Sequence, residues 1–126
     1  PVGEVSKIIN DDIIIVVMLE TPKAINNVEE IASVPGIDVL LVGTNDLCME
    51  MGIPGEFNHN DVKEAYKKVI QACNNNNILP GMGGVYDETL MHEYIDLGMK
   101  FILSGSDLSF LVKGAEDRLN NLKNKG

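Results

Sequence analysis

Two acidic residues that directly follow strand-like segments could together bind a divalent metal ion. Glu20 comes after the apolar run Ile13–Leu19, and Asp46 comes three residues after Gly43, at the end of the apolar segment 38–42. Neighbouring parallel strands lie about 4.8 Å apart, so both carboxylates can reach one point if these strands are neighbours. A few carboxylate oxygens, with water at the remaining positions, are a common way to hold Mg²⁺.

The same two positions have a purely structural interpretation. Glu20 precedes Thr21-Pro22, where negative charge at a helix N-terminus is favourable. Asp46 could be the N-cap of a short turn through residues 47–51. Spacing does not choose between these readings and a metal site.

Two further strand ends are polar or glycine-rich. Gly81, Gly83 and Gly84 miss the G-x-G-x-x-G pattern because Tyr86 occupies the third glycine position, which favours a close-packed strand exit. Ser106 and Asp107 are suitable N-caps for the last helix, although the loop after the last strand of a barrel is a common anion site.

The elements that must position these residues form four strand–helix repeats. The expected strands are apolar almost throughout, as in parallel sheets that are covered on both faces; they are Ile13–Leu19, Asp38–Val42, Ile78–Met82 and Lys100–Leu103. Four helices are expected, each after one strand: from Thr21-Pro22 to just before Val34-Pro35-Gly36, from near Val62 to Asn74–Asn77, from Asp87 to Leu97-Gly98, and from near Ser109 to Lys125. This α/β order fits either a small doubly wound sheet or half of a (β/α)₈ barrel, which takes about 250 residues in full.

Composition narrows the function classes. The 126 residues carry 10 Lys and Arg against 19 Asp and Glu, a net charge of −9 that disfavours nucleic-acid and anionic-membrane surfaces. No apolar run approaches the roughly 20 residues that span a bilayer, and no secretory signal opens the chain. Cys48 and Cys73 lack metal or redox spacing, so we expect reduced thiols and a cytoplasmic protein.

Candidate catalytic side chains are otherwise few. His59 lies in a polar stretch and His92 lies inside the third expected helix, so both are expected at the surface or in packing roles. Arg118 is the single arginine and falls far along the last helix. No Ser/His/Asp or Cys/His arrangement is indicated by position.

Several motifs resemble the pyruvate-dependent class II aldolases, the 4-hydroxy-2-oxoheptanedioate aldolase/citrate lyase family with its 2-dehydro-3-deoxyglucarate aldolase-like members. The resemblance covers roughly residues 13–118. It is carried by Glu20-Thr21-Pro22-Lys23-Ala24, Asn27–Ile31, Val34–Asp38, Val42–Leu47, Leu79–Gly81 and Gly105–Leu108. The most specific part is the acidic pair together with Gly-x-x-Asp-Leu.

The resemblance implies a fold and a site. The fold would be strands five to eight of a (β/α)₈ barrel of the phosphoenolpyruvate/pyruvate type, so residues 1–126 would form one domain, the C-terminal half of that barrel. The metal ligands would be Glu20 and Asp46, and the ion would be Mg²⁺, Mn²⁺ or Co²⁺. Backbone amides of Gly43, Thr44, Asn45 and Asp46 would bind the carboxylate of the 2-oxo acid.

The implied reaction is metal-assisted cleavage of a hydroxy-2-oxo acid to pyruvate, or a related 2-oxo acid, and an aldehyde. The base histidine and the substrate arginine of the family belong to the amino-terminal half, so no catalytic base is expected in this chain. A homo-oligomer is also expected. Met18 and Thr44-Asn45 depart from the usual Gln and Pro-Ala, which motivates one alternative, an inactive barrel relative. The other alternative is a self-standing doubly wound ligand-binding domain.

Overall fold

The computed structural model describes residues 2–123 and shows an α/β chain with one parallel sheet. The elements are α1 (Val2–Asp12), β1 (Val16–Leu19), α2 (Pro22–Asn26), α3 (Val28–Ala32), β2 (Val39–Gly43), α4 (Thr44–Glu50), α5 (Asn60–Asn76), β3 (Leu79–Gly83), α6 (Glu88–Leu97), β4 (Phe101–Ile102) and α7 (Asp107–Lys123). All four predicted strands are present: β1 and β4 are shorter than predicted, and β2 and β3 have the predicted length but begin and end one residue later. Within the described residues, no helix combines the length and hydrophobicity needed to cross a membrane.

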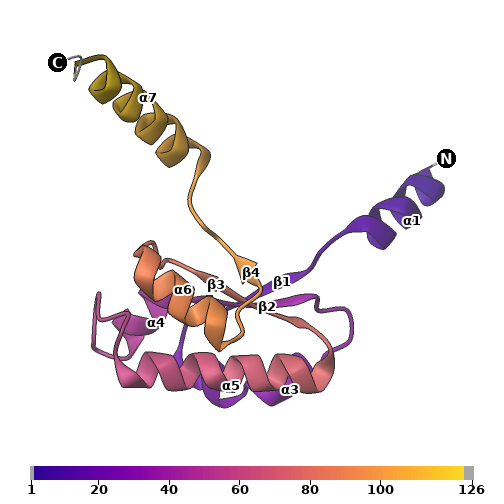
Figure 1. The fold of residues 1–126 in the computed structure, drawn as a ribbon. Helices are drawn as coiled ribbons and strands as arrows, with labels where there is room; N and C mark the ends of the chain where they lie inside the picture. The colour runs from indigo at the N-terminus through magenta and orange to yellow at the C-terminus, as the bar shows by residue number, and fades with distance from the viewer. Residues whose placement is uncertain (1, 124–126) are drawn as a thin grey trace.

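The strand order decides between the two predicted architectures. The sheet runs β1-β2-β3-β4 with every neighbouring pair parallel, so each strand lies beside the next strand in sequence. A doubly wound sheet instead reverses its order at a switch point and places helices on both faces. Here the intervening helices α3, α5 and α6 lie on one side of the sheet (Figure 1). The doubly wound alternative is therefore wrong, and the arrangement is that of half a barrel.

Local signals place the helix ends where the sequence predicts them. The Thr21 hydroxyl accepts the Ala24 N–H at the start of α2, and the Asp87 carboxylate accepts the Leu90 N–H at the start of α6. Asn77 ends α5 in the left-handed conformation, with φ 57° and ψ 36°. Asn tolerates that conformation better than most residues, which explains why α5 runs through Asn76 and stops there.

Two predicted helices need correction, and not every helix was predicted. The helix expected after Thr21 is two short helices, α2 and α3, because the chain breaks at Asn27, a residue type that competes with helical backbone bonds. Helix α1 was not predicted. Helix α7 begins at Asp107, two residues before the expected start at Ser109, and its expected end at Lys125 lies outside the described residues.

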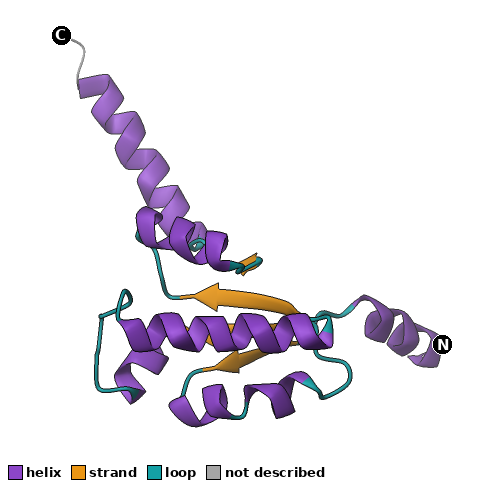
Figure 2. Cartoon of the chain, turned by 60° about the horizontal axis from the view of Figure 1, so that its bottom comes forward, coloured by secondary structure: helices purple, strands orange, loops and turns teal. Residues whose placement is uncertain are grey.

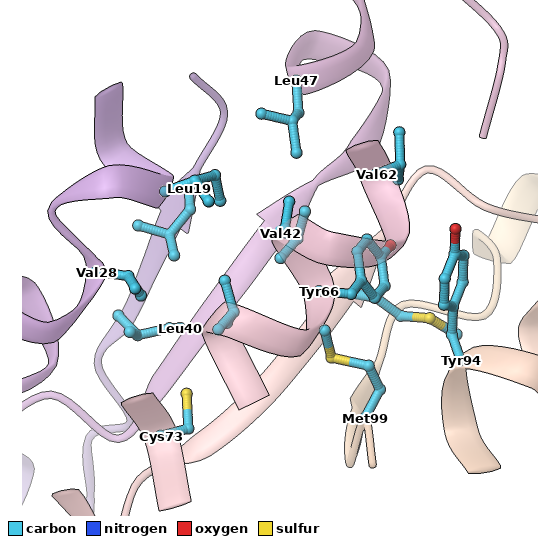
Figure 3. Close-up of a cluster of buried hydrophobic side chains, with 14 of the residues drawn as sticks. Leu19, Val28, Leu40, Val42, Leu47, Val62, Tyr66, Cys73, Tyr94 and Met99 are labelled. Atoms are coloured by element: carbon cyan, nitrogen blue, oxygen red, sulfur yellow. The ribbon is translucent and has the colours of Figure 1, made fainter. Parts of the chain in front are cut away.

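One hydrophobic core fills the space between the sheet and these helices. Leu19, Leu40 and Val42 lie on the side of the strands that packs against buried side chains of the helices (Figure 3). Met82 of β3 belongs to the same core. One face of α5 is buried along its length, at Val62, Ala65, Tyr66, Val69, Ala72 and Cys73, and Ile70 on the same face is partly buried. The strand residues between them point to the opposite face, where an added Cβ on Gly81 would lie 3.0 Å from side-chain atoms of both Val39 and Leu41.

That opposite face, the inner face of the half-barrel, is largely open. Val16, Met18, Leu79 and Leu103 lie along it or at its rim and stay more than one-third exposed. Helices α1 and α7 extend away from the sheet at its two ends, and no described side chain of either is buried (Figures 1 and 2). The predicted apolar stripe of the last helix, Leu111, Ala115, Leu119 and Leu122, is therefore present in sequence but unpacked.

Candidate active site

Glu20 lies directly against Gly43, at the carboxyl ends of two neighbouring strands. Leu19 and Val42 form the last residue pair between β1 and β2, and Glu20 and Gly43 are the residues that follow this pair on the two strands. A Cβ added to Gly43 would lie 2.7 Å from Glu20 Cγ and 2.8 Å from Glu20 Oε1. Such approaches are too close for real atoms, so only glycine at position 43 lets the half-buried Glu20 side chain occupy this place.

Asp46 lies in the first turn of α4, immediately beyond β2. Helix α4 begins at Thr44, with Gly43 in the N-cap position. The structural alternative, in which Asp46 is itself the N-cap of a turn, is therefore wrong. The exposed Asp46 carboxylate lies near the N-terminus of α4, which carries partial positive charge. That charge arises because the first backbone amides of a helix have no hydrogen-bond partner within the helix.

A small open cavity joins the strand exits. Its volume is about 190 Å³, and its lining residues come from all four strand ends: Met18, Leu41, Gly43, Thr44, Asn45, Asp46, Gly83, Gly84, Tyr86 and Leu103. Glu20 is not one of the lining residues, but its side chain lies against Gly43, which is. The structure thus brings the predicted substrate-binding residues and Asp46 to one place.

The chemistry of the two carboxylates fits a divalent cation. Within residues 2–123, neither the Glu20 nor the Asp46 carboxylate takes part in a hydrogen bond or an ion pair with a protein group. Carboxylates of this kind, one half-buried and one exposed beside a water-accessible cavity, suit Mg²⁺, which keeps several waters. No group of three or more His, Cys, Asp or Glu side chains in the described part of the chain is placed to hold a metal, so the two-carboxylate site remains a prediction.

The Thr44 side chain ties the turn to its surroundings through two hydrogen bonds. Its hydroxyl lies 2.7 Å from the Gly83 carbonyl oxygen and 2.7 Å from the Tyr66 hydroxyl. Tyr66 belongs to the buried stripe of α5, and sequence reasoning gave it only a packing role. A tyrosine on an otherwise apolar stripe is the signal that could have suggested a buried hydrogen bond, because its hydroxyl needs a partner there.

The glycine-rich exit of β3 serves close packing, as predicted. A Cβ on Gly83 would lie 3.1 Å from Leu103 Cδ1, and one on Gly84, whose φ is +87°, would lie 2.8 Å from Asn45 Nδ2. Gly84 therefore lets the β3 exit approach the turn that carries Asn45. At the β4 exit, Ser106 acts as an N-cap, since its hydroxyl accepts the Ser109 N–H.

Other candidate residues lie away from this cavity. His59 caps the start of α5, where its Nδ1 accepts the Asp61 N–H, while His92 and Arg118 are exposed on α6 and α7. Cys48 and Cys73 are free and buried, as expected for reduced thiols. Burial raises the pKa of both thiols, that of Cys73 to about 11, so both stay protonated near neutral pH.

The chain is similar in sequence to proteins of one known family. Residues 3–114 match the family model "HpcH/HpaI aldolase/citrate lyase". The chain is 38% identical over 82% of its length to a 4-hydroxy-4-methyl-2-oxoglutarate aldolase of Chaetomium globosum, and 34% identical over 85% of its length to a 4-hydroxy-2-oxo-heptane-1,7-dioate aldolase of Klebsiella pneumoniae. It spans 39% and 40% of those two relatives.

The chain is also similar in fold to a solved structure of the same family. The chain superposes over its whole length on 49% of an HpcH/HpaI aldolase from Desulfitobacterium hafniense, with a TM-score of 0.78 and 26% identity. The four strand–helix units thus correspond to about half of a (β/α)₈ barrel protein. This chain belongs to the HpcH/HpaI aldolase/citrate lyase family.

Proposed function

We propose that this chain is the carboxyl-terminal half of a metal-dependent aldolase barrel, and that residues 1–126 form one domain with the missing strands. The enzyme would cleave a hydroxy-2-oxo acid to pyruvate, or a related 2-oxo acid, and an aldehyde. The proposal rests on one observation above all. The Glu20 carboxylate lies across Gly43, beside the turn that carries Asp46, and neither carboxylate has a protein partner within residues 2–123.

In this proposal Glu20 and Asp46 hold Mg²⁺, Mn²⁺ or Co²⁺. When bound, such an ion supplies Lewis-acid charge that stabilises the negative charge developing on the 2-oxo oxygen during carbon–carbon cleavage. Glu20 is half-buried, so its carboxylate is held at a fixed place, while the exposed Asp46 leaves room for water and substrate oxygens.

The turn after β2 would bind and orient the carboxylate of the 2-oxo acid. Backbone amides of Gly43, Thr44 and Asn45, followed by that of Asp46, approach the cavity at the start of α4. Successive amides at such a position attract anions without needing a cationic side chain. This agrees with the location of Arg118 on α7, outside the residues that line the cavity.

Proton transfer to and from the aldehyde hydroxyl would come from outside this chain. Both histidines of the described residues lie away from the cavity, and no His, Lys or Arg side chain lines it. We therefore assign no catalytic base here, and we expect it in the other half of the barrel. The relatives' names favour a 4-hydroxy-2-oxo acid as the substrate class.

Removal of either carboxylate tests the proposal. In the complete barrel, Glu20→Gln and Asp46→Asn should each lower metal-dependent aldehyde release from a 4-hydroxy-2-oxo acid by at least about 100-fold, because a ligand of a reaction-essential ion is lost. Asp96→Asn is the matched control: Asp96 is an exposed carboxylate on α6, near the end that leads into β4. Undiminished turnover in both site variants would refute the metal assignment.

One observation supports a second candidate, a barrel relative without catalysis. Met18 is 53% exposed and lines the same cavity as Asp46, at a position where the resembled family often has a polar Gln. This candidate predicts Mn²⁺ binding but no pyruvate formation from any hydroxy-2-oxo acid. Met18→Gln should then raise turnover from an undetectable level, whereas an active enzyme would show turnover without that change.

A further inference from the structure

Among the described residues, Thr44 is fully buried although its side chain is small and polar. It stands between Gly43 and the exposed Asn45 and Asp46, at the junction of β2 and α4. Burying a hydroxyl without hydrogen bonds destabilises the folded protein, so the partners of this hydroxyl have structural consequences. Two partners are present.

The directions of the two hydrogen bonds follow from their chemistry. The Gly83 carbonyl can only accept, so the Thr44 hydroxyl donates its single proton to that oxygen. The Tyr66 hydroxyl must then donate to Thr44 Oγ1, over 2.7 Å. The result is a directed chain from Tyr66 through Thr44 to Gly83, which links α5, the start of α4 and the end of β3.

The Tyr66 side chain is itself held firmly. It is fully buried, and its ring stacks on Tyr94 with the ring centroids 4.0 Å apart. The Tyr94 hydroxyl donates to the Phe57 carbonyl, so it points to a different partner and takes no part in the chain to Thr44. Figure 3 shows the two rings side by side, between α5 and α6.

The end of β3 in turn touches the Asp46-bearing turn a second time. Gly84 follows Gly83, and its added Cβ would lie 2.8 Å from Asn45 Nδ2 and 3.3 Å from the Asn45 backbone nitrogen. A shift of Thr44 relative to Gly83 would therefore move Asn45 and Asp46 relative to the β3 exit. The turn has no other side-chain hydrogen bond within residues 2–123 to resist that shift.

We propose that the Thr44 hydroxyl, oriented by Tyr66, is a positioning group that fixes the Gly43–Asp46 turn against the end of β3, and through it the Asp46 carboxylate. The proposal rests on the proposed function for its consequence in catalysis. Neither side chain touches the substrate in this scheme, since both hydroxyls are buried and are hydrogen-bonded to protein groups.

Variants that remove one hydroxyl at a time provide the test, made in the complete barrel. Thr44→Val keeps the shape and the backbone amide but deletes both hydrogen bonds, and Tyr66→Phe deletes only the bond to Thr44. Thr44→Ser restores the hydroxyl. Tyr94→Phe is the matched control, because it removes a hydroxyl from the neighbouring stacked ring whose hydrogen bond goes to Phe57.

The first readout is Mn²⁺ affinity, measured by calorimetry without substrate. Partners that orient metal ligands typically change affinity about 10- to 100-fold when removed. We expect Thr44→Val to weaken Mn²⁺ binding about tenfold and to lower kcat/KM at saturating Mn²⁺, Tyr66→Phe to act in the same direction but less, and Thr44→Ser to stay within about threefold of the parent. Tyr94→Phe should leave Mn²⁺ affinity within about twofold.

The second readout does not depend on metal or activity. Amide hydrogen exchange of residues 43–46, measured well below the unfolding temperature, should speed up several-fold in Thr44→Val and not in Tyr94→Phe. If the unsubstituted protein neither binds Mn²⁺ nor cleaves any 2-oxo acid, the proposed function is wrong. Hydrogen exchange in the Thr44 variants still tests the positioning role of Thr44 in that case. Unchanged exchange in Thr44→Val, or equal effects of Thr44→Val and Tyr94→Phe on exchange and affinity, would overturn the proposal.

Discussion

Gly43 restricts the candidate site sterically, because any side chain at this position would collide with Glu20. Gly43 has φ −81° and ψ 86°, which other residues can adopt, so no backbone strain demands glycine there. The demand comes from Glu20, whose Cγ and Oε1 occupy the space that a Cβ would need. A substitution at position 43 should therefore move the Glu20 carboxylate by steric contact without changing the backbone conformation.

Gly43→Ala should consequently fold but displace the Glu20 side chain. We expect Mn²⁺ affinity and metal-dependent aldehyde release to fall about tenfold or more, as when a group that orients a metal ligand is changed. Calorimetry and a turnover assay measure the two effects. Gly114→Ala is the control, since an added Cβ at Gly114 on α7 meets nothing within 4 Å. Full Mn²⁺ affinity in Gly43→Ala would show that Glu20 is not a ligand.

At the scale of elements, α5 joins the core to the site. Its buried stripe packs beneath β2 and β3, and the same stripe carries Tyr66 and Cys73. Burial raises the pKa of Tyr66 to about 12 and raises that of Cys73 to about 11. Both groups hold their protons more tightly in the folded protein than in the unfolded chain.

This difference predicts a loss of stability at alkaline pH. A group with a raised folded pKa stabilises fully below its unfolded pKa, here 9.0 for Cys73 and 10.0 for Tyr66, and loses that stability as pH rises through its folded pKa. The free energy of unfolding should therefore fall from about pH 9 to pH 12, by on the order of 2 kcal/mol from Tyr66 alone.

Urea unfolding at pH 7, 9, 10 and 11 measures the decline. Tyr66→Phe removes one titrating group, so its free energy of unfolding should decline less steeply above pH 10 while keeping the part due to Cys73. A free energy that stays level between pH 9 and pH 11 in the parent protein would contradict the assignment of these buried groups.

At the scale of the whole molecule, the described chain leaves large apolar surfaces uncovered. The inner sheet face is open at Val16 and Met18, and helix α7 exposes Leu108, Phe110 and Leu111 by more than half of their surfaces. Helix α1 does the same with Val5, Ile8 and Ile9. In a closed barrel the outer strands pair with further strands, whereas here β1 and β4 each have one unpaired edge.

The 126-residue polypeptide on its own should therefore associate. We expect oligomers at micromolar concentration in light scattering after size exclusion, together with strong binding of a hydrophobic dye, because strand edges and apolar faces of this size are rarely left in water. Replacing Leu111 and Leu122 by Glu should reduce the mass without unfolding the sheet. A dye-negative monomer with one cooperative unfolding transition would contradict this expectation.

Local chemistry made much of this predictable from sequence. Strand runs, the Thr21 and Asp87 caps and the Asn77 terminator depend on neighbours within a few residues, so composition and period suffice to find them. The Gly-x-x-Asp-Leu motif and Glu20 could be singled out for the same reason, since each directly follows an apolar strand. Helix α1 was not predicted, and none of its described side chains is buried, so its short amphipathic pattern has no part in the core.

The sequence did not predict the strand order. The same four strand–helix repeats can form a sheet in sequential order or a doubly wound sheet, and hydrogen bonds between strands that are distant in sequence determine which one forms. The bond from Tyr66 to Thr44 was equally out of reach, since it joins residues 22 positions apart whose meeting requires α5 to lie under β2. Sequence alone thus determined which elements form and which carboxylates end the strands. The tertiary structure decided that these ends share one cavity, because proximity across a sheet is a property of packing rather than of local conformation.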